Sequence, residues 1–230
     1  DKKPKKHLHF LMRDNPILGD AEIARAESFF AGVFYQRFIL GEWVLSEGLV
    51  YDFGEQNIVD EIPSNGEYYI SIDYGTMNPF SAGLWCVLGD KATRIKEYYY
   101  NGREKAVQRT DEDYCDSVEE LAKGYNIRQI VVDPSAASFI AALRRRGFTI
   151  RKANNDVLDG IRRTAVYLKN GNIKIHRSCV DAIAEFGLYR WDDKATADTV
   201  IKENDHAMDD IRYFCNTIMK NKVRKESNYT

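Results

Sequence analysis

The sequence lacks several features that would place it in a familiar class. Its four cysteines, Cys86, Cys115, Cys179 and Cys215, are widely spaced and include no Cys-x-x-Cys pair, so the chain carries no zinc-finger or dithiol redox motif. No apolar run is long enough to span a bilayer. A Gly-x-x-x-x-Gly-Lys-Ser/Thr phosphate loop is also absent, so we expect no ATP hydrolysis by that route.

The sequence has little excess charge of either sign. Its 33 Lys and Arg against 35 Asp and Glu give a formal net charge of -2, and 44% of the residues are hydrophobic. This composition excludes a chain that is disordered throughout, and 230 residues suffice for one domain plus an extension. A near-neutral balance does not favour nucleic-acid binding by bulk charge, but it allows a local basic groove.

The pattern of elements divides the chain into three parts. We expect residues 1–62 to be a connector or extension, with one helix from Asp20 towards Phe38 and no independent core. The main domain follows over residues 63–222, and the Lys-rich tail over residues 223–230 is expected to be disordered. Because the chain does not begin with methionine, we expect it to be a fragment of a longer polypeptide.

Within the main domain, the hydrophobic pattern predicts an α/β sheet with strands of mixed direction. Three strands with short connections imply an antiparallel meander, and the alternation of helices and strands that follows is typical of a parallel part. The expected strands cover residues 68–73, 81–88, 92–100, 127–133, 148–153 and 172–176, and the expected helices cover residues 110–124, 138–146, 156–170, 180–190 and 206–220.

Two of the expected strands end in an aspartate, Asp73 and Asp133. A single aspartate at a strand end is usually a turn residue or a helix cap. Both strands are nearly all apolar and should be central, and ligand chemistry in open α/β sheets lies at the carboxyl ends of the strands. Two carboxylates close together repel each other unless a cation bridges them. The pair therefore predicts a metal site.

A third group of acids lies at the start of the last expected helix, around Asp205, His206, Asp209 and Asp210. His206 and Asp209 are three residues apart, so they share a helix face. Alone, these acids would be N-terminal helix residues stabilised by the helix dipole. In combination with two strand-end aspartates they favour a metal site, with Asp209 as the third ligand and Asp210 as the alternative.

The residue types indicate which metal and which chemistry to expect. Carboxylates with one imidazole suit Mg²⁺ or Mn²⁺. Two such ions, roughly 3.5–4 Å apart, can activate water and stabilise the leaving oxygen in phosphodiester cleavage. We assign Asp73 to bridge both ions, Asp133 and Asp209 to complete one ion's shell each, and His206 to orient a water or to ligate weakly.

Basic residues follow the predicted site along the chain. Groups near a carboxylate site would hold DNA phosphates, although a solvated helix face explains any one of them equally well. The candidates for DNA contact are Arg144, Arg145, Arg162, Lys169 and Lys174.

The sequence resembles a known family, the C-terminal nuclease domain of the large terminase subunit of tailed bacteriophages. It is most similar to the headful-packaging type found in Bacillus phages. The resemblance covers nearly the whole chain in the right order and rests on Ser71-Ile72-Asp73-Tyr74-Gly75, Val132-Asp133-Pro134-Ser135, Val157-Leu158-Asp159-Gly160-Ile161, Asn204-Asp205-His206-Ala207-Met208-Asp209 and Arg212-Tyr213, together with the stretch from Gly41-Glu42-Trp43 to Val50-Tyr51.

The resemblance implies a ribonuclease-H-like fold and a nuclease that cuts concatemeric double-stranded viral DNA with two divalent cations, Mg²⁺ or Mn²⁺. The family's three acidic ligands correspond to Asp73, Asp133 and Asp209, and its additional histidine to His206. Asp210 stands where relatives often have a small residue. The full protein would carry an N-terminal packaging ATPase. It would work with the portal protein and the small terminase subunit in the host cytoplasm, neither secreted nor membrane-bound.

Two other functions stay open on the sequence. The stretch Asp73-Tyr74-Gly75-Thr76 resembles the phosphate turn of actin-like and sugar-kinase proteins, which would make the chain an ATP-binding phosphotransferase. Those chains duplicate the domain, and no second phosphate turn occurs here. The other possibility is a non-catalytic DNA-docking module in which the acids are structural.

Overall fold

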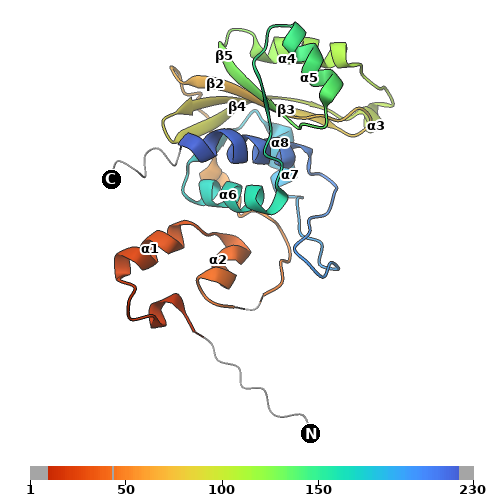
Figure 1. Cartoon of the computed structure of the whole chain (residues 1–230). Helices are drawn as coiled ribbons and strands as arrows, with labels where there is room; N and C mark the ends of the chain where they lie inside the picture. The colour runs from red at the N-terminus through yellow and green to blue at the C-terminus, as the bar shows by residue number, and fades with distance from the viewer. Residues whose placement is uncertain (1–9, 43, 223–230) are drawn as a thin grey trace.

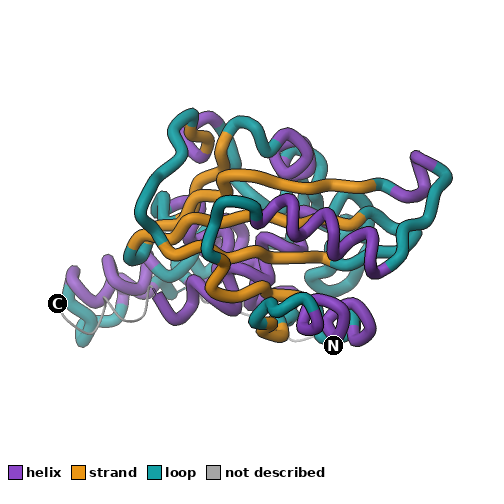
Figure 2. Tube along the Cα trace, turned by 90° about the horizontal axis from the view of Figure 1, so that it is seen from above, coloured by secondary structure: helices purple, strands orange, loops and turns teal. Residues whose placement is uncertain are grey.

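A seven-stranded sheet forms the centre of the computed structural model, which describes residues 10–42 and 44–222. Its middle is an antiparallel meander of β2 (Glu67–Asp73), β3 (Phe80–Leu88) and β4 (Lys91–Tyr100). These long strands run side by side across the molecule in Figure 2. The predicted antiparallel meander is confirmed.

The remaining strands extend this meander on both sides in parallel. Next to β2 lie β5 (Ile127–Val132) and then β6 (Ile150–Lys152). Next to β4 lie β7 (Ile173–His176) and then the two-residue strand β1 (Ile58–Val59). The order β1-β7-β4-β3-β2-β5-β6 confirms the predicted mixed sheet, with β2 at the junction of its antiparallel and parallel parts.

Helices cover both faces of the sheet because its central strands are apolar on both sides. Ile70 and Ile72 of β2 pack against α4 (Asp111–Ala122) and α5 (Ala137–Arg145). The opposite face lies against a second group of helices, below the sheet in Figure 1. This group consists of α6 (Val157–Lys169), α7 (Val180–Phe186) and α8 (His206–Phe214).

The helix that carries the third group of acids is buried from its second residue, Ala207, onward. α8 continues without a break into the π-helical segment η3 (Cys215–Met219), so the helix predicted over residues 206–220 is confirmed. It packs on β2, β3 and β5 and is covered by α6 and α7. π-helical turns are rare and occur frequently near functional sites. α7 is shorter than predicted: its last residue is Phe186, and Arg190 pairs with Leu49 instead of continuing the helix.

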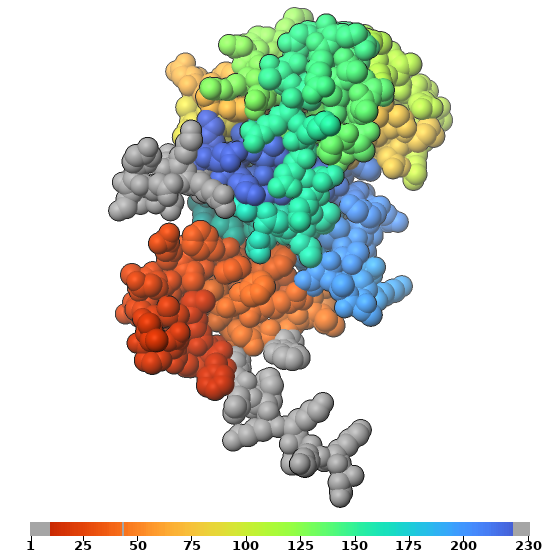
Figure 3. Space-filling view, in the orientation of Figure 1, coloured from red at the N-terminus to blue at the C-terminus, as the bar shows by residue number. Residues whose placement is uncertain are grey.

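The N-terminal residues form a separate layer beneath α6, orange in Figures 1 and 3. The single helix predicted from Asp20 to Phe38 is wrong: the structure has α1 (Asp20–Ser28) and α2 (Gly32–Phe38). The break follows from the backbone, since Ala31 is extended and Gly32 has a φ of +54°, which an L residue adopts only with strain.

Parts of the N-terminal segment join the core of the main domain. Phe34, Val50 and Tyr51 belong to the same buried cluster as α7 and α8, and β1 belongs to the sheet. The division of the chain after residue 62 stays a prediction, as does the tail at residues 223–230, which lies outside the described residues.

Three short helical turns complete the fold: η1 (Met12–Asp14), η2 (Glu55–Asn57) and α3 (Gly102–Lys105). Within residues 10–42 and 44–222, no helix has the length and apolar character needed to cross a bilayer.

Candidate active site

The sheet brings Asp73 and Asp133 to the same edge. β2 and β5 are parallel neighbours, and Ile72 is paired with Val132. Asp73 and Asp133 are the next residues of the two strands, so both carboxylates emerge at the carboxyl edge of the sheet. The adjacency of the two strand-end aspartates is confirmed, and its cause is the direct pairing of the two apolar strands.

Helix α8 adds His206 to this edge. Nδ1 of His206 lies 2.9 Å from Oδ2 of Asp73, although α8 is far from β2 in the sequence. Burial raises the pKa of Asp73 to about 6, the charge of Asp209 adds to this, and the hydrogen bond from His206 opposes it. Burial lowers the pKa of His206, but the hydrogen bond and charge of Asp73 outweigh it, so the pKa of His206 is raised.

Asp209 lies one turn further along α8 and pairs with two cations. Its Oδ1 is 2.8 Å from Nη2 of the buried Arg212, and its Oδ2 is 3.5 Å from Nζ of the exposed Lys202. Its charge also destabilises the ionised form of Asp73, which places the two carboxylates in one electrostatic environment.

Asp133 is held by donors from its own loop and from the start of α6. Its Oδ1 accepts from the backbone N–H of Ser135 at 2.7 Å, and its Oδ2 accepts from Nδ2 of Asn155 at 3.2 Å. Burial alone would raise the pKa of Asp133. Its hydrogen bonds, including one from the Tyr213 hydroxyl, outweigh burial and lower the pKa.

The Tyr213 hydroxyl lies in the field of all three carboxylates and donates to one of them, Asp133, a role that the sequence did not predict. Burial raises the pKa of its hydroxyl, and the charges of Asp73, Asp209 and Asp133 raise it further. The signal available in the sequence was its spacing of four residues from Asp209, which puts both on one face of α8.

The donor set fits a hard divalent cation in its chemistry. Three carboxylates and one imidazole are the ligands that Mg²⁺ and Mn²⁺ accept, and the pKa of Asp73 is raised mainly by burial and further by the charge of Asp209, although His206 opposes both. The ligands are not gathered around one point, however. In the described part of the chain, no three such side chains lie close enough to hold an ion together. Asp133 and Asp209 are instead turned towards Asn155 and Arg212.

Asp210, the alternative third ligand, is buried in the core under the sheet. Its carboxylate accepts hydrogen bonds from Ser71 at 2.8 Å, from Ser81 and from both terminal nitrogens of Arg94. Burial alone would lower the pKa of Arg94, but the charges of Asp210 and Glu97 raise it. The arrangement favours Asp209 over Asp210 as a residue that reaches the site.

Glu185 on α7 fixes the start of α8. Its Oε2 accepts from the backbone N–H groups of Ala207 at 2.7 Å and Met208 at 3.4 Å, and Tyr99 donates to its Oε1 at 2.6 Å. A carboxylate at a helix N-terminus satisfies free N–H groups and is favoured by the helix dipole. Burial nevertheless raises the pKa of Glu185 to about 7.

Two of the predicted DNA contacts lie away from the carboxylates, and most of the five have partners within the chain. Arg144 is exposed and Arg145 pairs with Glu112, and both lie at the end of α5 that is about 13 Å from its start beside Asp133. The other three also have intramolecular partners: Arg162 pairs with Asp159, Lys169 donates to Phe30 O and Lys174 to Gln56 O. Their contact with DNA stays a prediction.

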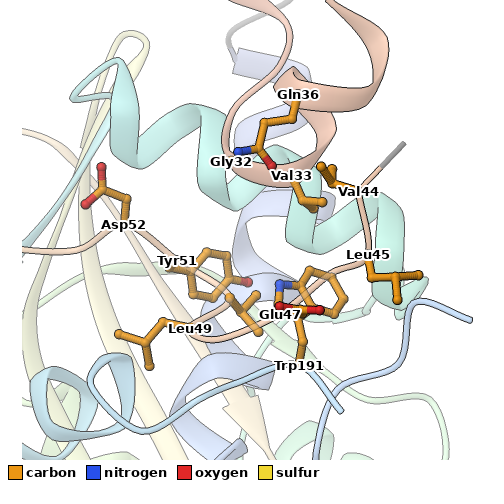
Figure 4. Close-up of a pocket in the computed structure, with 11 residues that line it drawn as sticks. Gly32, Val33, Gln36, Val44, Leu45, Glu47, Leu49, Tyr51, Asp52 and Trp191 are labelled. Atoms are coloured by element: carbon orange, nitrogen blue, oxygen red, sulfur yellow. The ribbon is translucent and has the colours of Figure 1, made fainter. Parts of the chain in front are cut away.

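A cleft of about 850 Å³ lies away from the carboxylates, between α2, residues 44–52 and Trp191 (Figure 4). Its lining is mixed, with the apolar Val33 and Leu45 near Trp191 and the polar Gln36 among the other lining residues. The acids Glu47 and Asp52 line it without a partner histidine, so the cleft does not share the chemistry of the sheet edge.

Comparison with known proteins finds similarity to large terminase subunits of bacteriophages. A sequence model described as the terminase RNaseH-like domain matches residues 70–217. The large terminase subunit of Escherichia phage T5 is 22% identical over 233 residues, which covers 94% of this chain and 52% of that protein.

Solved structures of large terminases are similar to this chain as well. The large terminase from a thermophilic bacteriophage is 43% identical with a TM-score of 0.86, covering 93% of this chain and 56% of that one. The nuclease domain of the P22 large terminase has a TM-score of 0.60 at 16% identity, covering 77% and 93%. The large terminase nuclease from phage G20c with bound cobalt has a TM-score of 0.52 at 12% identity, covering 75% and 87%. The chain thus spans about half the length of the phage T5 protein and of the 43% identical terminase.

Proposed function

This chain belongs to the family of terminase ribonuclease-H-like domains, and we propose that it is the nuclease that cuts concatemeric double-stranded viral DNA during genome packaging. The mixed sheet with helices on both faces is the ribonuclease-H-like fold expected from the sequence. Function rests on the site and not on the fold alone.

One observation carries the proposal: Asp73 and Asp133 stand side by side at the carboxyl edge of the sheet, and α8 brings His206 and Asp209 to the same edge. Burial and the charge of Asp209 both raise the pKa of Asp73, and a bound cation would favour its ionised form. Divalent cations held by Asp73, Asp133 and Asp209 would supply an activated water and stabilise the leaving oxygen of a phosphodiester.

The residues of this chain then have separate tasks. The imidazole of His206 orients the Asp73 carboxylate through Nδ1, so that one of its oxygens stays available. The hydroxyl of Tyr213 donates to Asp133 and adds to the donors from Ser135 and Asn155 that lower the pKa of that carboxylate. Glu185 holds the first turn of α8, which fixes where His206 and Asp209 stand relative to β2.

The cation chemistry has a parallel in one similar structure, since the nuclease from phage G20c was determined with bound cobalt. We propose two ions, Mg²⁺ or Mn²⁺, for this chain because its ligands are hard oxygen atoms. The portal protein and the small terminase subunit are proposed partners of the longer protein of which this chain would be one domain.

A plasmid-nicking assay tests the function. The chain is incubated with supercoiled plasmid and Mn²⁺ or Mg²⁺, and cleavage is compared with that of Asp73→Asn, Asp133→Asn and Asp209→Asn. We expect each substitution to reduce cleavage by about 100-fold or more, as expected when groups that act as a unit are removed, with the fold retained by circular dichroism. The exposed Asp193→Asn is the matched control and should cleave normally.

The same assay separates the other candidate functions. Cleavage that survives both Asp73→Asn and Asp133→Asn contradicts the assigned site. A wild-type chain that binds DNA but cleaves with neither metal favours a docking module. Binding of ATP in equilibrium dialysis, with no cleavage, favours a phosphotransferase.

A further inference from the structure

Arg212 is a buried cation beside one of the proposed metal ligands. Its side chain is only 2% exposed, and it lies three residues after Asp209 on α8. Nη2 and Nε of Arg212 lie 2.8 Å and 3.3 Å from the same atom, Oδ1 of Asp209. The guanidinium thus occupies one oxygen of the carboxylate, and Oδ2 is the oxygen that faces the exposed Lys202.

The third nitrogen of Arg212 reaches a different element. Nη1 donates to the carbonyl oxygens of Asn155 at 3.0 Å and Asp156 at 3.3 Å, just before α6 begins. The side chain of Asn155 in turn donates to Oδ2 of Asp133 at 3.2 Å. Asp209 is therefore linked to Asp133 through Arg212 and Asn155, whose backbone binds Arg212 and whose side chain binds Asp133.

We propose that Arg212 is a positioning residue for the metal centre, an inference that rests on the proposed function. Its guanidinium presents Oδ2 of Asp209 to the site and, through the Asn155 carbonyl, holds the loop that orients Asp133. Partners of this kind orient metal ligands and affect metal affinity without touching the ion.

The planar shape of the side chain explains why arginine occupies this position. Arginine has five donors in a rigid fork, so one side chain reaches a carboxylate and two carbonyls at once, whereas lysine offers a single point of charge. The fold reserves the space that the fork needs. A Cβ built on Gly160 of α6 would overlap Cγ of Arg212.

Two simpler roles for Arg212 lead to different expectations. If it only joins α6 to α8, its loss lowers stability and leaves metal affinity unchanged. If it is only a cation that competes for Asp209, its loss tightens metal binding. A positioning role instead predicts weaker metal binding even when the charge is kept.

The test is Mn²⁺ binding to the whole chain by isothermal titration calorimetry. Arg212→Lys keeps the charge and loses the fork, and we expect its dissociation constant to rise about 10-fold or more, the usual cost of removing such a partner. Arg212→Gln and the exposed Asn155→Ala should also bind Mn²⁺ more weakly. The matched control is Arg163→Gln, which removes an arginine joining α6 to η3 through Asn216 and should bind as wild type does.

Each outcome bears on the inference separately from the proposed function. Normal or tighter Mn²⁺ binding by Arg212→Lys overturns the positioning role, even if the variant melts at a lower temperature. If Arg212→Gln does not fold, Arg212→Lys and Asn155→Ala decide, and normal binding by both overturns the inference. Binding that depends on Asp73 but not on Arg212 refutes the inference alone. A wild-type chain that binds no Mn²⁺ refutes the metal centre and the inference with it.

Discussion

The Asp210 carboxylate lies 2.5 Å from Nη1 of Arg94, and both side chains are completely buried between α8 and the sheet. Oδ1 also accepts from Ser71, so the pair is hydrogen-bonded as well as charged. Removal of one partner from such a pair leaves a buried, uncompensated charge, which costs about 3–5 kcal/mol. Asp210 is therefore a structural acid that ties α8 to β2 and β4.

We predict that Asp210→Asn lowers the free energy of unfolding by about 3 kcal/mol or more, measured by urea denaturation. Asp159→Asn removes an acid from the more exposed pairs with Arg162 and Arg163, and should cost about 1 kcal/mol or less. If Asp210→Asn unfolds at the wild-type urea concentration and loses Mn²⁺ binding instead, Asp210 is the ligand and Asp209 is not.

The acids of the site differ in how far the sequence alone could predict their roles. Asp73 and Asp133 were predictable because each ends an apolar run, and such strands lie at the centre of a sheet. The choice between Asp209 and Asp210 was not settled, because it depends on Arg94. Arg94 pairs with Ile175 and Trp85 in a strand register that local sequence does not specify.

Contacts that depend on tertiary packing also could not be predicted from the sequence. Arg212 is one residue of a helix, and only the docking of α6 brings the Asn155 carbonyl to it. The break between α1 and α2 was missed because the apolar spacing continues through Phe29 and Phe30, whereas Gly32 takes a positive φ. Periodicity records which side of a segment is apolar and not whether its backbone stays helical.

The buried Glu185 should make the stability of the metal-free chain depend on pH. Its pKa is raised by burial to about 7, whereas an unfolded glutamate titrates near 4.5. A raised folded pKa contributes stability that is complete below about pH 4.5 and is lost as the pH rises through 7. The shift corresponds to about 3 kcal/mol.

We therefore expect the melting temperature in EDTA to fall between pH 5 and pH 8, and Glu185→Gln to reduce that slope. Glutamine keeps the size and can still accept from the α8 backbone, but it does not titrate. The exposed Glu203→Gln makes the same charge change at the surface and should leave the slope unchanged. If the melting temperature of Glu185→Gln falls with pH as steeply as that of the wild type, burial does not destabilise the ionised Glu185 carboxylate.

Asp73 should reduce stability in the absence of metal. Its pKa is raised to about 6 by burial and by the charge of Asp209, so at pH 8 the ionised carboxylate costs the folded state about 3 kcal/mol. Asp73→Asn should raise the melting temperature in EDTA at pH 8, and raise it less at pH 5, where the wild-type carboxyl is largely protonated.

Added Mn²⁺ should raise the melting temperature of the wild type but not that of Asp73→Asn. A ligand present at 100 times its dissociation constant stabilises the folded state by about 2.7 kcal/mol, so wild type should melt at a higher temperature with Mn²⁺. Asp73→Asn should not respond. An equal increase in both proteins would mean that Asp73 does not hold the ion.

Gly160 offers a way to displace Arg212 without changing its chemistry. Alanine is a better helix former than glycine by about 1 kcal/mol, so Gly160→Ala within α6 would ordinarily stabilise the chain. Here the new Cβ would overlap Cγ of Arg212, which must move away from Asp209 or push α6 outward. Overpacking of this kind costs about 1–3 kcal/mol.

We predict that Gly160→Ala lowers the melting temperature and weakens Mn²⁺ binding in calorimetry. At Gly187 the nearest atom to an added Cβ is Ala184 O at 3.4 Å, so Gly187→Ala should change neither quantity. A Gly160→Ala chain that is more stable than wild type and binds Mn²⁺ normally would show that the position of the Arg212 side chain does not matter to the site.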